Sequence, residues 1–223
     1  MRRNAISLTK VEGPEGRAEA ISVIERVYLA EKGWLRDASA ELPLSKEPSG
    51  NRSWFLARVG GDPAGVIRLS YDPPLEIPPE LDFHFEQGVD LARLRQGGRF
   101  VEVGRFMILP EYRSRIGVAL KLMGAAVGEV VERGYTHFIT DVFEGDPHSP
   151  LAFHTRVLGF QRIGSHRFGE LSSDRRRIVL VLDIAATYLR LRERKDRVFR
   201  ELTGGLSELL EGLLLRRRLE LAP

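Results

Sequence analysis

The apolar and polar residues of this chain follow two periods, and the change of period separates strands from helices. Residues 5–11 (AISLTKV) alternate apolar and polar positions and predict an edge strand. Residues 53–59 and 64–71 predict two more strands, and the Gly-Gly-Asp turn between them favours an antiparallel hairpin. Further strands are predicted at residues 100–109, 136–143, 159–168 and 177–184.

Helical spacing marks four other segments. Residues 17–31 and residues 116–133 each carry an apolar face and end next to a glycine, which is a common helix end. Residues 150–158 predict a short helix. Residues 185–221 predict a helical tail that divides at residues 204–205, because paired glycines weaken a helix interior. The leucines of this tail are too irregular for a heptad repeat, so packing on the core, pairing with a second chain and binding a partner all stay open.

Two polar stretches interrupt this pattern. Residues 37–52 have the composition of a mobile loop. Residues 72–98 form a Pro-rich insertion with a short helical piece, and structureless loops of this length are uncommon in compact domains. We therefore expect the insertion to cover a functional site.

The stretch 100–119 (FVEVGRFMILPEYRSRIGVA) joins a buried strand to a helix through a proline and an arginine-bearing loop. Backbone N–H groups at a helix start lack internal partners, and the helix dipole favours anions there. Two arginines add permanent positive charge to this loop. We therefore expect a phosphorylated thioester donor at this place. The residues assigned to it are Arg113, Arg115, Ile116, Gly117 and Val118.

Composition narrows the possible chemistry. The chain has 223 residues, 43% of them hydrophobic and 29% charged, which fits one sizeable globular domain with appended helices. The chain has no cysteine, so disulfides, thiolate metal sites and a cysteine nucleophile are excluded. No His, Asp and Glu spacing resembles a metal site, and no metal is expected.

The charge and the apolar runs indicate which partners to expect. A formal net charge of +3 is too modest to indicate a nucleic-acid-binding protein. No apolar run approaches the roughly 20 residues of a membrane span, and no signal segment opens the chain, so we expect a cytoplasmic protein. The arginines do cluster, which would suit an acidic protein partner.

The order of elements and the loop motif resemble the GNAT family of N-acetyltransferases over residues 53–184. In that family the loop reads Arg/Gln-x-x-Gly-x-Gly/Ala, whereas RSRIGVA from Arg113 has one glycine fewer. Thr155 stands where the family often has a tyrosine that protonates the leaving thiolate. His154 and His148 could donate a proton instead, but we expect surface or helix-capping roles for both. The resemblance implies an α/β fold with a mixed, mostly antiparallel central sheet flanked by helices, followed by a C-terminal helical extension.

Three segments narrow this resemblance to the acyl-homoserine lactone synthases and the related long-chain N-acyl amino acid synthases. They are ERVYLAEKGW at residues 25–34, IRL at residues 67–69 and EVGRF at residues 102–106. Those families take a fatty acyl chain from acyl carrier protein, so the resemblance implies an acyl-phosphopantetheine donor, on acyl carrier protein or on coenzyme A. Acyl carrier protein is acidic and would suit the arginine clusters.

The chemistry and the resemblance together suggest roles for individual residues. An amine must lose a proton before it attacks, and Glu102 is the candidate base; an ion pair with Arg105 or Arg68 that only fixes the pocket is an equal alternative. The backbone at Met107 and Ile108 is expected to stabilise the thioester oxygen and to pair with the pantetheine amides. The expected catalytic residues are Glu102 and Arg105, and the expected substrate-binding residues are Arg26, Tyr28, Trp34, Arg68 and Phe106.

The lactone synthases carry two aspartates before the second strand, whereas residues 44–52 contain none. This favours an amino acid or a similar amine as the acceptor of the acyl group. We therefore expect an N-acyltransferase domain at residues 1–184 with a helical extension at residues 185–223. The alternatives are an acetyl-CoA-dependent N-acetyltransferase of a small amine or protein, an autoinducer synthase, and a catalytically silent binding module.

Overall fold

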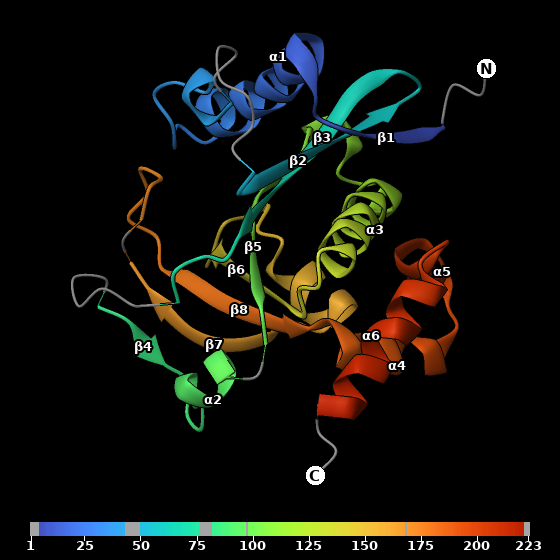
Figure 1. Ribbon diagram of the computed structural model, residues 1–223. Helices are drawn as coiled ribbons and strands as arrows, with labels where there is room; N and C mark the ends of the chain where they lie inside the picture. The colour runs from blue at the N-terminus through green and yellow to red at the C-terminus, as the bar shows by residue number, and fades with distance from the viewer. Residues whose placement is uncertain (1–4, 43–49, 76–81, 97, 168, 221–223) are drawn as a thin grey trace. The chain divides into compact units, whose positions relative to one another are not determined.

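The computed structural model describes residues 5–42, 50–75, 82–96, 98–167 and 169–220. The chain forms two compact units, one of Met1–Tyr71 with Val103–Ala126 and one of Asp72–Glu102 with Val127–Pro223. The sheet order is β1-β2-β3-β5-β6-β8-β7-β4, and β5 (Phe100–Ile108) and α3 (Ile116–Glu132) each contribute residues to both units (Figure 1). The predicted α/β class with a mostly antiparallel sheet flanked by helices is confirmed.

The first unit is built on an antiparallel meander. Its elements are β1 (Ile6–Lys10), α1 (Gly13–Ile24), the π-helical segment η1 (Glu25–Glu31), the 3-10 turns η2 (Ser39–Glu41) and η4 (Pro110–Tyr112), β2 (Arg52–Val59) and β3 (Asp62–Tyr71). Phe55 of β2 lies opposite Lys10 of β1 and Ile67 of β3, so β2 is the central strand of the meander. The hairpin predicted from the Gly-Gly-Asp turn is confirmed.

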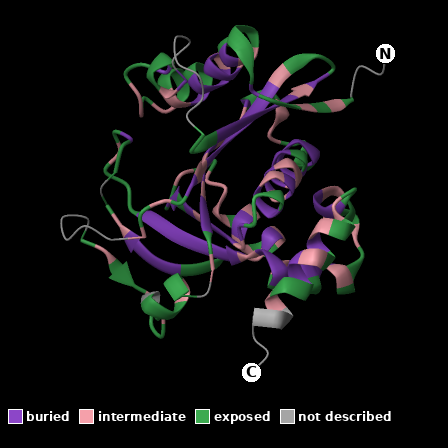
Figure 2. Cartoon of the chain, viewed as in Figure 1, coloured by how far each residue is buried: buried purple, intermediate pink, exposed green. Residues whose placement is uncertain are grey.

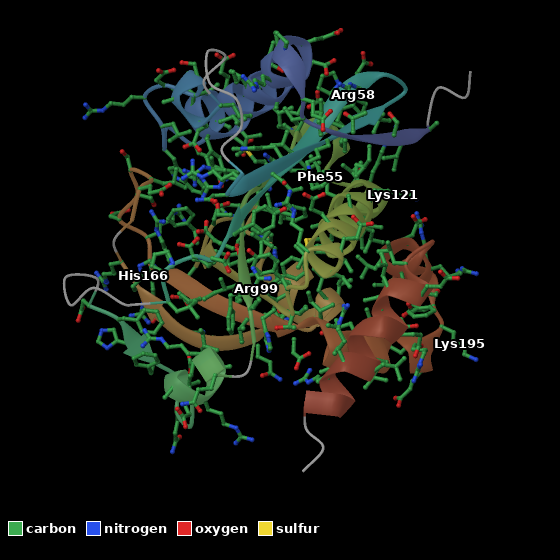
Figure 3. All side chains as sticks on the ribbon, in the orientation of Figure 1. Phe55, Arg58, Arg99, Lys121, His166 and Lys195 are labelled. Atoms are coloured by element: carbon green, nitrogen blue, oxygen red, sulfur yellow. The ribbon has the colours of Figure 1, made fainter. Side chains whose placement is uncertain are left out.

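The core of this unit lies between α1 and the sheet. Ile24 and Val27 pack with Leu56, Val66 and Met107, and all five are almost fully buried. β2 and β3 are accordingly mostly buried in Figure 2, whereas β1 has intermediate and exposed residues and α1 presents both buried and exposed ones. At the sheet surface Arg58, labelled in Figure 3, pairs with Glu19 of α1 and donates to the Thr9 hydroxyl at 2.8 Å.

The first helix differs from the regular helix predicted at residues 17–31. It begins at Gly13, because Pro14 fits the first turn of a helix, where its missing N–H is not needed. From Glu25 it widens into η1, in which the N–H of Lys32 donates to the Val27 carbonyl at 3.0 Å. Such π segments are rare and occur often at functional sites.

The second unit carries the other half of the sheet and the C-terminal helices. Its elements are β4 (His84–Phe85), α2 (Leu91–Gln96), β6 (His137–Phe143), the π-helical segment η5 (Phe153–Leu158), β7 (Gln161–His166), β8 (Arg177–Asp183), α4 (Ile184–Arg194), α5 (Arg197–Thr203) and α6 (Ser207–Glu220). Phe100 of β5 pairs in parallel with His137 of β6, and β8 pairs antiparallel with β6 and β7. Phe100, Ile163, Val179 and Val181 form the buried centre of a core cluster.

The C-terminal helices pack within the second unit. Leu191, Leu210 and Leu213 are buried, and the Tyr188 hydroxyl donates to Glu211 at 2.9 Å. The tail divides at residues 204–205 as predicted, and also at Lys195, which adopts a left-handed φ of 48°. Among the described residues, no helix is both long enough and apolar enough to cross a membrane.

Candidate active site

Arg105 is the most constrained of the predicted site residues. It has a φ of 48°, a left-handed conformation that non-glycine residues seldom adopt, and the residue is only 8% exposed. Its guanidinium donates to both oxygens of Glu41, from Nε to Oε2 at 3.0 Å and from Nη2 to Oε1 at 2.7 Å. Backbone strain of this kind persists only where the surroundings hold it, and it is frequent at functional sites.

Arg68 reaches the same carboxylate from β3. Its Nη1 lies 3.4 Å from Oε2 of Glu41, so two guanidiniums share one carboxylate. The side chains of Arg68, Arg105 and Glu41 are 4%, 7% and 12% exposed. Breaking an ion pair with so little solvent costs the folded state more than breaking a surface pair, because removing either charge leaves the other one buried. We call these three residues the Glu41 cluster.

Two aromatic residues extend the Glu41 cluster. The Arg105 guanidinium lies 5.8 Å from the centre of the Tyr28 ring, within cation–π range. Tyr28 in turn meets Trp34 edge to face, with ring centres 5.2 Å apart. The π-helical turn fixes this pair, since the Trp34 N–H donates to the Tyr28 carbonyl at 2.8 Å. The structure therefore brings Tyr28, Trp34, Arg68 and Arg105 together, while their roles stay predictions.

The loop after β5 is tied to η1 by ion pairs. Arg113 donates to Glu31 from Nη1 at 3.0 Å and from Nη2 at 2.5 Å, and its Nε donates to the Ile108 carbonyl at 3.1 Å. Burial acts to raise the pKa of Glu31, but Arg113 and Lys32 outweigh it and lower that pKa. Arg113 thus binds Glu31 and the Ile108 carbonyl in this structure. Its predicted contact with phosphate stays a proposal, in which the guanidinium binds the phosphate beside these partners or in place of them.

Arg26 lies outside the Glu41 cluster. It pairs with Glu111 at 2.9 Å, and the two side chains are 51% and 46% exposed. The Arg26 guanidinium lowers the pKa of Glu111. An ion pair this exposed contributes little to stability, so Arg26 serves here as a surface link between η1 and η4.

The end of β5 shows which backbone groups point away from β3. The Leu109 N–H donates to the Ala64 carbonyl at 2.9 Å, and the Met107 carbonyl would lie 2.7 Å from a Cβ added to Gly65. Because successive backbone groups of a strand alternate in direction, the N–H and carbonyl of Ile108 point the other way. Of the two predicted oxyanion-stabilising residues, Ile108 is therefore better placed than Met107.

The start of α3 is the place where the phosphate of the donor was predicted. Ile116 is 41% exposed, whereas Gly117 and Val118 are buried. The Val118 N–H donates to the Arg115 carbonyl at 2.9 Å, and the Arg115 guanidinium lies 5.7 Å from the Tyr112 ring centre. The assignment of this loop to phosphate binding stays a prediction.

Glu102 and Phe106 are both half-buried residues of β5. Glu102 lies opposite Ile139 and is the last residue of β5 that is paired with β6 in the described structure. Its assignment as the base and the assignment of Phe106 to substrate binding stay predictions.

Sequence reasoning missed the two carboxylates that organise this region, Glu41 and Glu31. Glu31 is the last residue of the helix predicted at residues 17–31, where an acidic residue is ordinary, and Glu41 falls within the stretch read as a mobile loop. Only the expectation that Arg68 and Arg105 need an acidic partner could have pointed to Glu41. Residues 43–49, which hold most of the stretch without aspartate, lie outside the described residues.

His154 corrects one expectation. It is fully buried rather than at the surface, and its Nδ1 lies 2.9 Å from the Pro150 carbonyl. Burial lowers its pKa to about 4, so it is neutral at physiological pH and cannot serve as a ready acid. In the described part of the chain, no group of three or more His, Asp or Glu residues is placed to hold a metal ion.

Comparisons with known proteins identify relatives of this arrangement. The family model described as N-acyl amino acid synthase FeeM matches residues 19–173. A search of curated protein sequences gave no match.

Solved structures extend the comparison at the level of the fold. FeeM, an N-acyl amino acid synthase from uncultured soil microbes, superposes with a TM-score of 0.63 at 19% identity, covering 86% of this chain and 99% of FeeM. A putative GNAT acetyltransferase from Desulfovibrio desulfuricans gives 0.57 at 13% identity, covering 80% and 99%. The NatC complex bound to Gag peptide and CoA gives 0.50 at 14% identity, covering 80% and 98%.

Proposed function

Because the chain belongs to the N-acyl amino acid synthase FeeM family and is an N-acyltransferase, we propose that it transfers an acyl group from a phosphopantetheine thioester to the amino group of an amino acid. The donor in this proposal is a long-chain acyl group on acyl carrier protein, or on coenzyme A. Residues 1–184 carry the transfer chemistry, and residues 185–223 are an extension of that domain.

The Glu41 cluster is the observation that carries the choice of acceptor. An amino acid differs from a simple amine by its carboxylate, and guanidiniums bind carboxylates through paired N–H groups. Arg68 and Arg105 already hold one carboxylate in this way, from Glu41, at 2.7 to 3.4 Å. An amino acid whose carboxylate binds the guanidiniums of Arg68 and Arg105 would also have its amino group held close to these two side chains.

The loop before α3 supports the choice of donor. The positive end of the α3 dipole and the Arg115 guanidinium suit the phosphate of phosphopantetheine, which both acyl carrier protein and coenzyme A contain. The missing glycine of the loop disfavours the larger nucleotide diphosphate of coenzyme A. A structurally similar protein, the NatC complex, holds coenzyme A, so that donor is tested beside acyl carrier protein.

The reaction needs two proton transfers from the nitrogen and one acyl transfer. Glu102 accepts a proton from the ammonium group of the amino acid, directly or through water. The amine then attacks the thioester carbon, and the N–H of Ile108 donates to the oxyanion that forms. Collapse of this intermediate forms the amide bond and breaks the carbon–sulfur bond. The nitrogen loses its second proton to the departing thiolate, which leaves as the phosphopantetheine thiol, and Glu102 passes the first proton to water.

Purified protein tests the proposal when one acyl chain is offered on two carriers. Dodecanoyl-acyl carrier protein, dodecanoyl-CoA and acetyl-CoA are each incubated with a mixture of the twenty amino acids, with and without S-adenosylmethionine, and the products are identified by mass spectrometry. We expect N-dodecanoyl amino acids, with a higher kcat/KM from the carrier protein. Transfer of acetyl groups alone would favour the N-acetyltransferase alternative, and a lactone formed only with S-adenosylmethionine would favour the autoinducer synthase.

A variant of Arg105 separates acceptor binding from donor binding. Arg105→Lys keeps the charge and removes the planar fork that binds carboxylates. We expect the KM for the amino acid to rise about tenfold, as for loss of one charged hydrogen bond, while the KM for the acyl donor stays within twofold. An equal loss with both substrates, in a variant that unfolds at the wild-type temperature, would contradict a role of Arg105 in binding the acceptor.

A further inference from the structure

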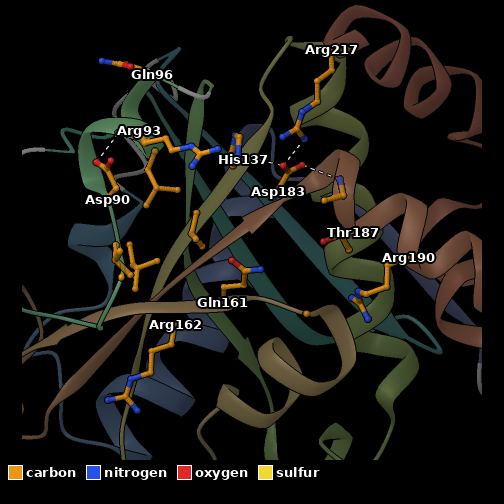
Figure 4. Close-up of a pocket in the computed structure, with 17 residues that line it drawn as sticks. Asp90, Arg93, Gln96, His137, Gln161, Arg162, Asp183, Thr187, Arg190 and Arg217 are labelled. Atoms are coloured by element: carbon orange, nitrogen blue, oxygen red, sulfur yellow. Dashed lines mark hydrogen bonds and ion pairs between the residues drawn. The ribbon is translucent and has the colours of Figure 1, made fainter. Parts of the chain in front are cut away.

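A pocket of about 1030 Å³ is lined only by residues of the second unit. None of these residues is assigned above to the acyl transfer. Figure 4 shows its lining: the Pro-rich insertion with α2 contributes one wall, α4 and α6 contribute another, and β6, β7 and β8 contribute the floor. The insertion and the C-terminal extension are the two segments for which the acyl transfer gives no role. The pocket is therefore a separate feature that both segments build.

Positive charge dominates the lining. Four arginines face two aspartates, Asp90 and Asp183, and His137 is kept neutral because burial lowers its pKa. Three of the arginines are engaged by protein groups. Arg217 pairs with Asp183, Arg162 pairs with Glu86 at 2.5 Å, and Arg190 donates to the Leu158 carbonyl at 2.5 Å.

Arg93 is the fourth arginine and differs from the others. It is exposed on α2, and within the residues that the structure describes its guanidinium makes no hydrogen bond or ion pair. Its backbone N–H is held by the Asp90 carboxylate at 3.0 Å, which anchors the first turn of the helix. The Arg93 guanidinium can therefore bind an anion without first breaking an ion pair with another residue of the described structure.

Four apolar residues line the pocket: Ile163 and Val181 on the floor, and Val89 and Leu94 on the wall formed by the insertion and α2. Ile163 and Val181 are buried residues of the core cluster of this unit, and Val89 and Leu94 pack against that cluster. Gln161 and Thr187 also line the pocket and add an amide and a hydroxyl to it (Figure 4). A pocket of this size can hold a small molecule, and most of the side chains that line it are polar or charged.

We infer that this pocket binds a small amphiphilic anion, with a carboxylate or phosphate head at Arg93 and a short apolar body over Val89, Leu94, Ile163 and Val181. The ligand needs both the charged head and the apolar body. The arginines alone would suit inorganic phosphate, and the four apolar residues alone would suit a neutral apolar molecule. The inference does not depend on which donor or acceptor the transferase uses.

Isothermal titration calorimetry of the full chain tests the inference with four probes: octyl phosphate, octanoate, inorganic phosphate and octyl glucoside. The first two carry the proposed head on an apolar body, the third lacks the body and the fourth lacks the charge. We expect saturable binding of octyl phosphate, of octanoate or of both, and no comparable binding of the other two. Equally tight binding of inorganic phosphate, or of octyl glucoside, would overturn the inference.

Two matched variants locate the binding. Arg93→Gln removes the proposed head contact on an exposed side chain, and Arg200→Gln makes the same charge change on exposed α5, away from the pocket. We expect Arg93→Gln to weaken binding about tenfold, as for loss of one charged hydrogen bond, and Arg200→Gln to leave binding within twofold. Equal affinities for wild type and Arg93→Gln would place the ligand elsewhere, for instance in the acyl site, and would overturn the inference.

Discussion

Replacing Glu41 by glutamine removes one charge from the centre of the candidate site and keeps the shape of the side chain. Glu41 accepts hydrogen bonds from Arg105 at 3.0 and 2.7 Å and from Arg68 at 3.4 Å. The substitution leaves two guanidiniums close together with far less compensating charge. We expect both a loss of stability and a disordered acceptor site.

The burial of the Glu41 cluster sets the size of this effect. With side chains only 4% to 12% exposed, removal of one partner should cost the folded state about 3 kcal/mol, at the lower end of values for broken buried pairs. The exposed pair of Arg26 and Glu111 provides the matched comparison, because Glu111→Gln makes the same chemical change at 46% exposure and should cost less than about 1 kcal/mol. Glu31→Gln, in a pair 25% and 23% exposed, should fall between them.

Urea unfolding of the wild type and the three variants measures these differences. The free energies should fall in the order wild type, Glu111→Gln, Glu31→Gln and Glu41→Gln, with unchanged denaturant slopes. A double variant of Glu41→Gln with Arg68→Gln should recover part of the loss, because it removes one of the two guanidiniums. If Glu41→Gln costs no more than Glu111→Gln, the ion pairs do not organise the site and the argument from burial is wrong.

Three other predictions follow from packing, helix propensity and titration. Gly65→Ala should destabilise the protein by about 1–3 kcal/mol in thermal or urea unfolding. The new Cβ would lie 2.7 Å from the Met107 carbonyl oxygen, a backbone atom that cannot rotate away. An unchanged stability would contradict this packing. Gly212→Ala, in α6 with no atom within 4 Å of the new Cβ, should instead stabilise by up to about 1 kcal/mol, and a loss in the same assay would show a crowded helix. His154 has a folded pKa of about 4 against an ordinary value of 6.5, so the unfolded chain binds more protons between these values and stability falls as the pH falls through that window. At about 1.4 kcal/mol for each pKa unit, the protein loses about 2 kcal/mol of stability from pH 7.5 to pH 5. His154→Asn should reduce this pH dependence by that amount. An unchanged pH dependence would show that His154 is not the group responsible.

The regular elements were predictable because their side chains repeat a simple pattern. The Gly-Gly-Asp turn between two apolar runs predicted the central hairpin, and the apolar face of α3 predicted its start at Ile116 and its end within one residue. Most of β2 and β3 is buried, and α3 carries an apolar face, so burial in the core determines where the apolar residues stand. The family was also recognised from short motifs, which the match over residues 19–173 confirms.

The π-helical turn of η1 was not predictable from periodicity. Tyr28 and Trp34 are joined by a backbone hydrogen bond at a spacing of six residues, which a search for a 3.6-residue period reads as an ordinary helix end. The break at Lys195 was missed for a similar reason, since a lysine with positive φ gives no glycine signal.

The candidate site was predictable only in part, because ion pairs join residues far apart in the sequence. Arg68 and Arg105 were recognised from motifs, but Glu41 lies 27 and 64 positions from them, in a segment without periodicity. The role proposed for Arg113 shows the converse limit. Its place before a helix suggested a phosphate contact, whereas its guanidinium binds Glu31, which is 82 positions away.

Mass spectrometry of lipid extracts from a heterologous bacterial host tests the central claim most directly. The host expresses the wild type, Glu102→Ala or Arg200→Gln, or carries an empty vector. We predict a new series of N-acyl amino acids with the wild type and with Arg200→Gln, absent from the empty vector and lost with Glu102→Ala. The masses would identify the acceptor and the length of the acyl chain. Folded wild-type protein in a host that makes no new acylated amino acid would contradict the proposed acyl transfer.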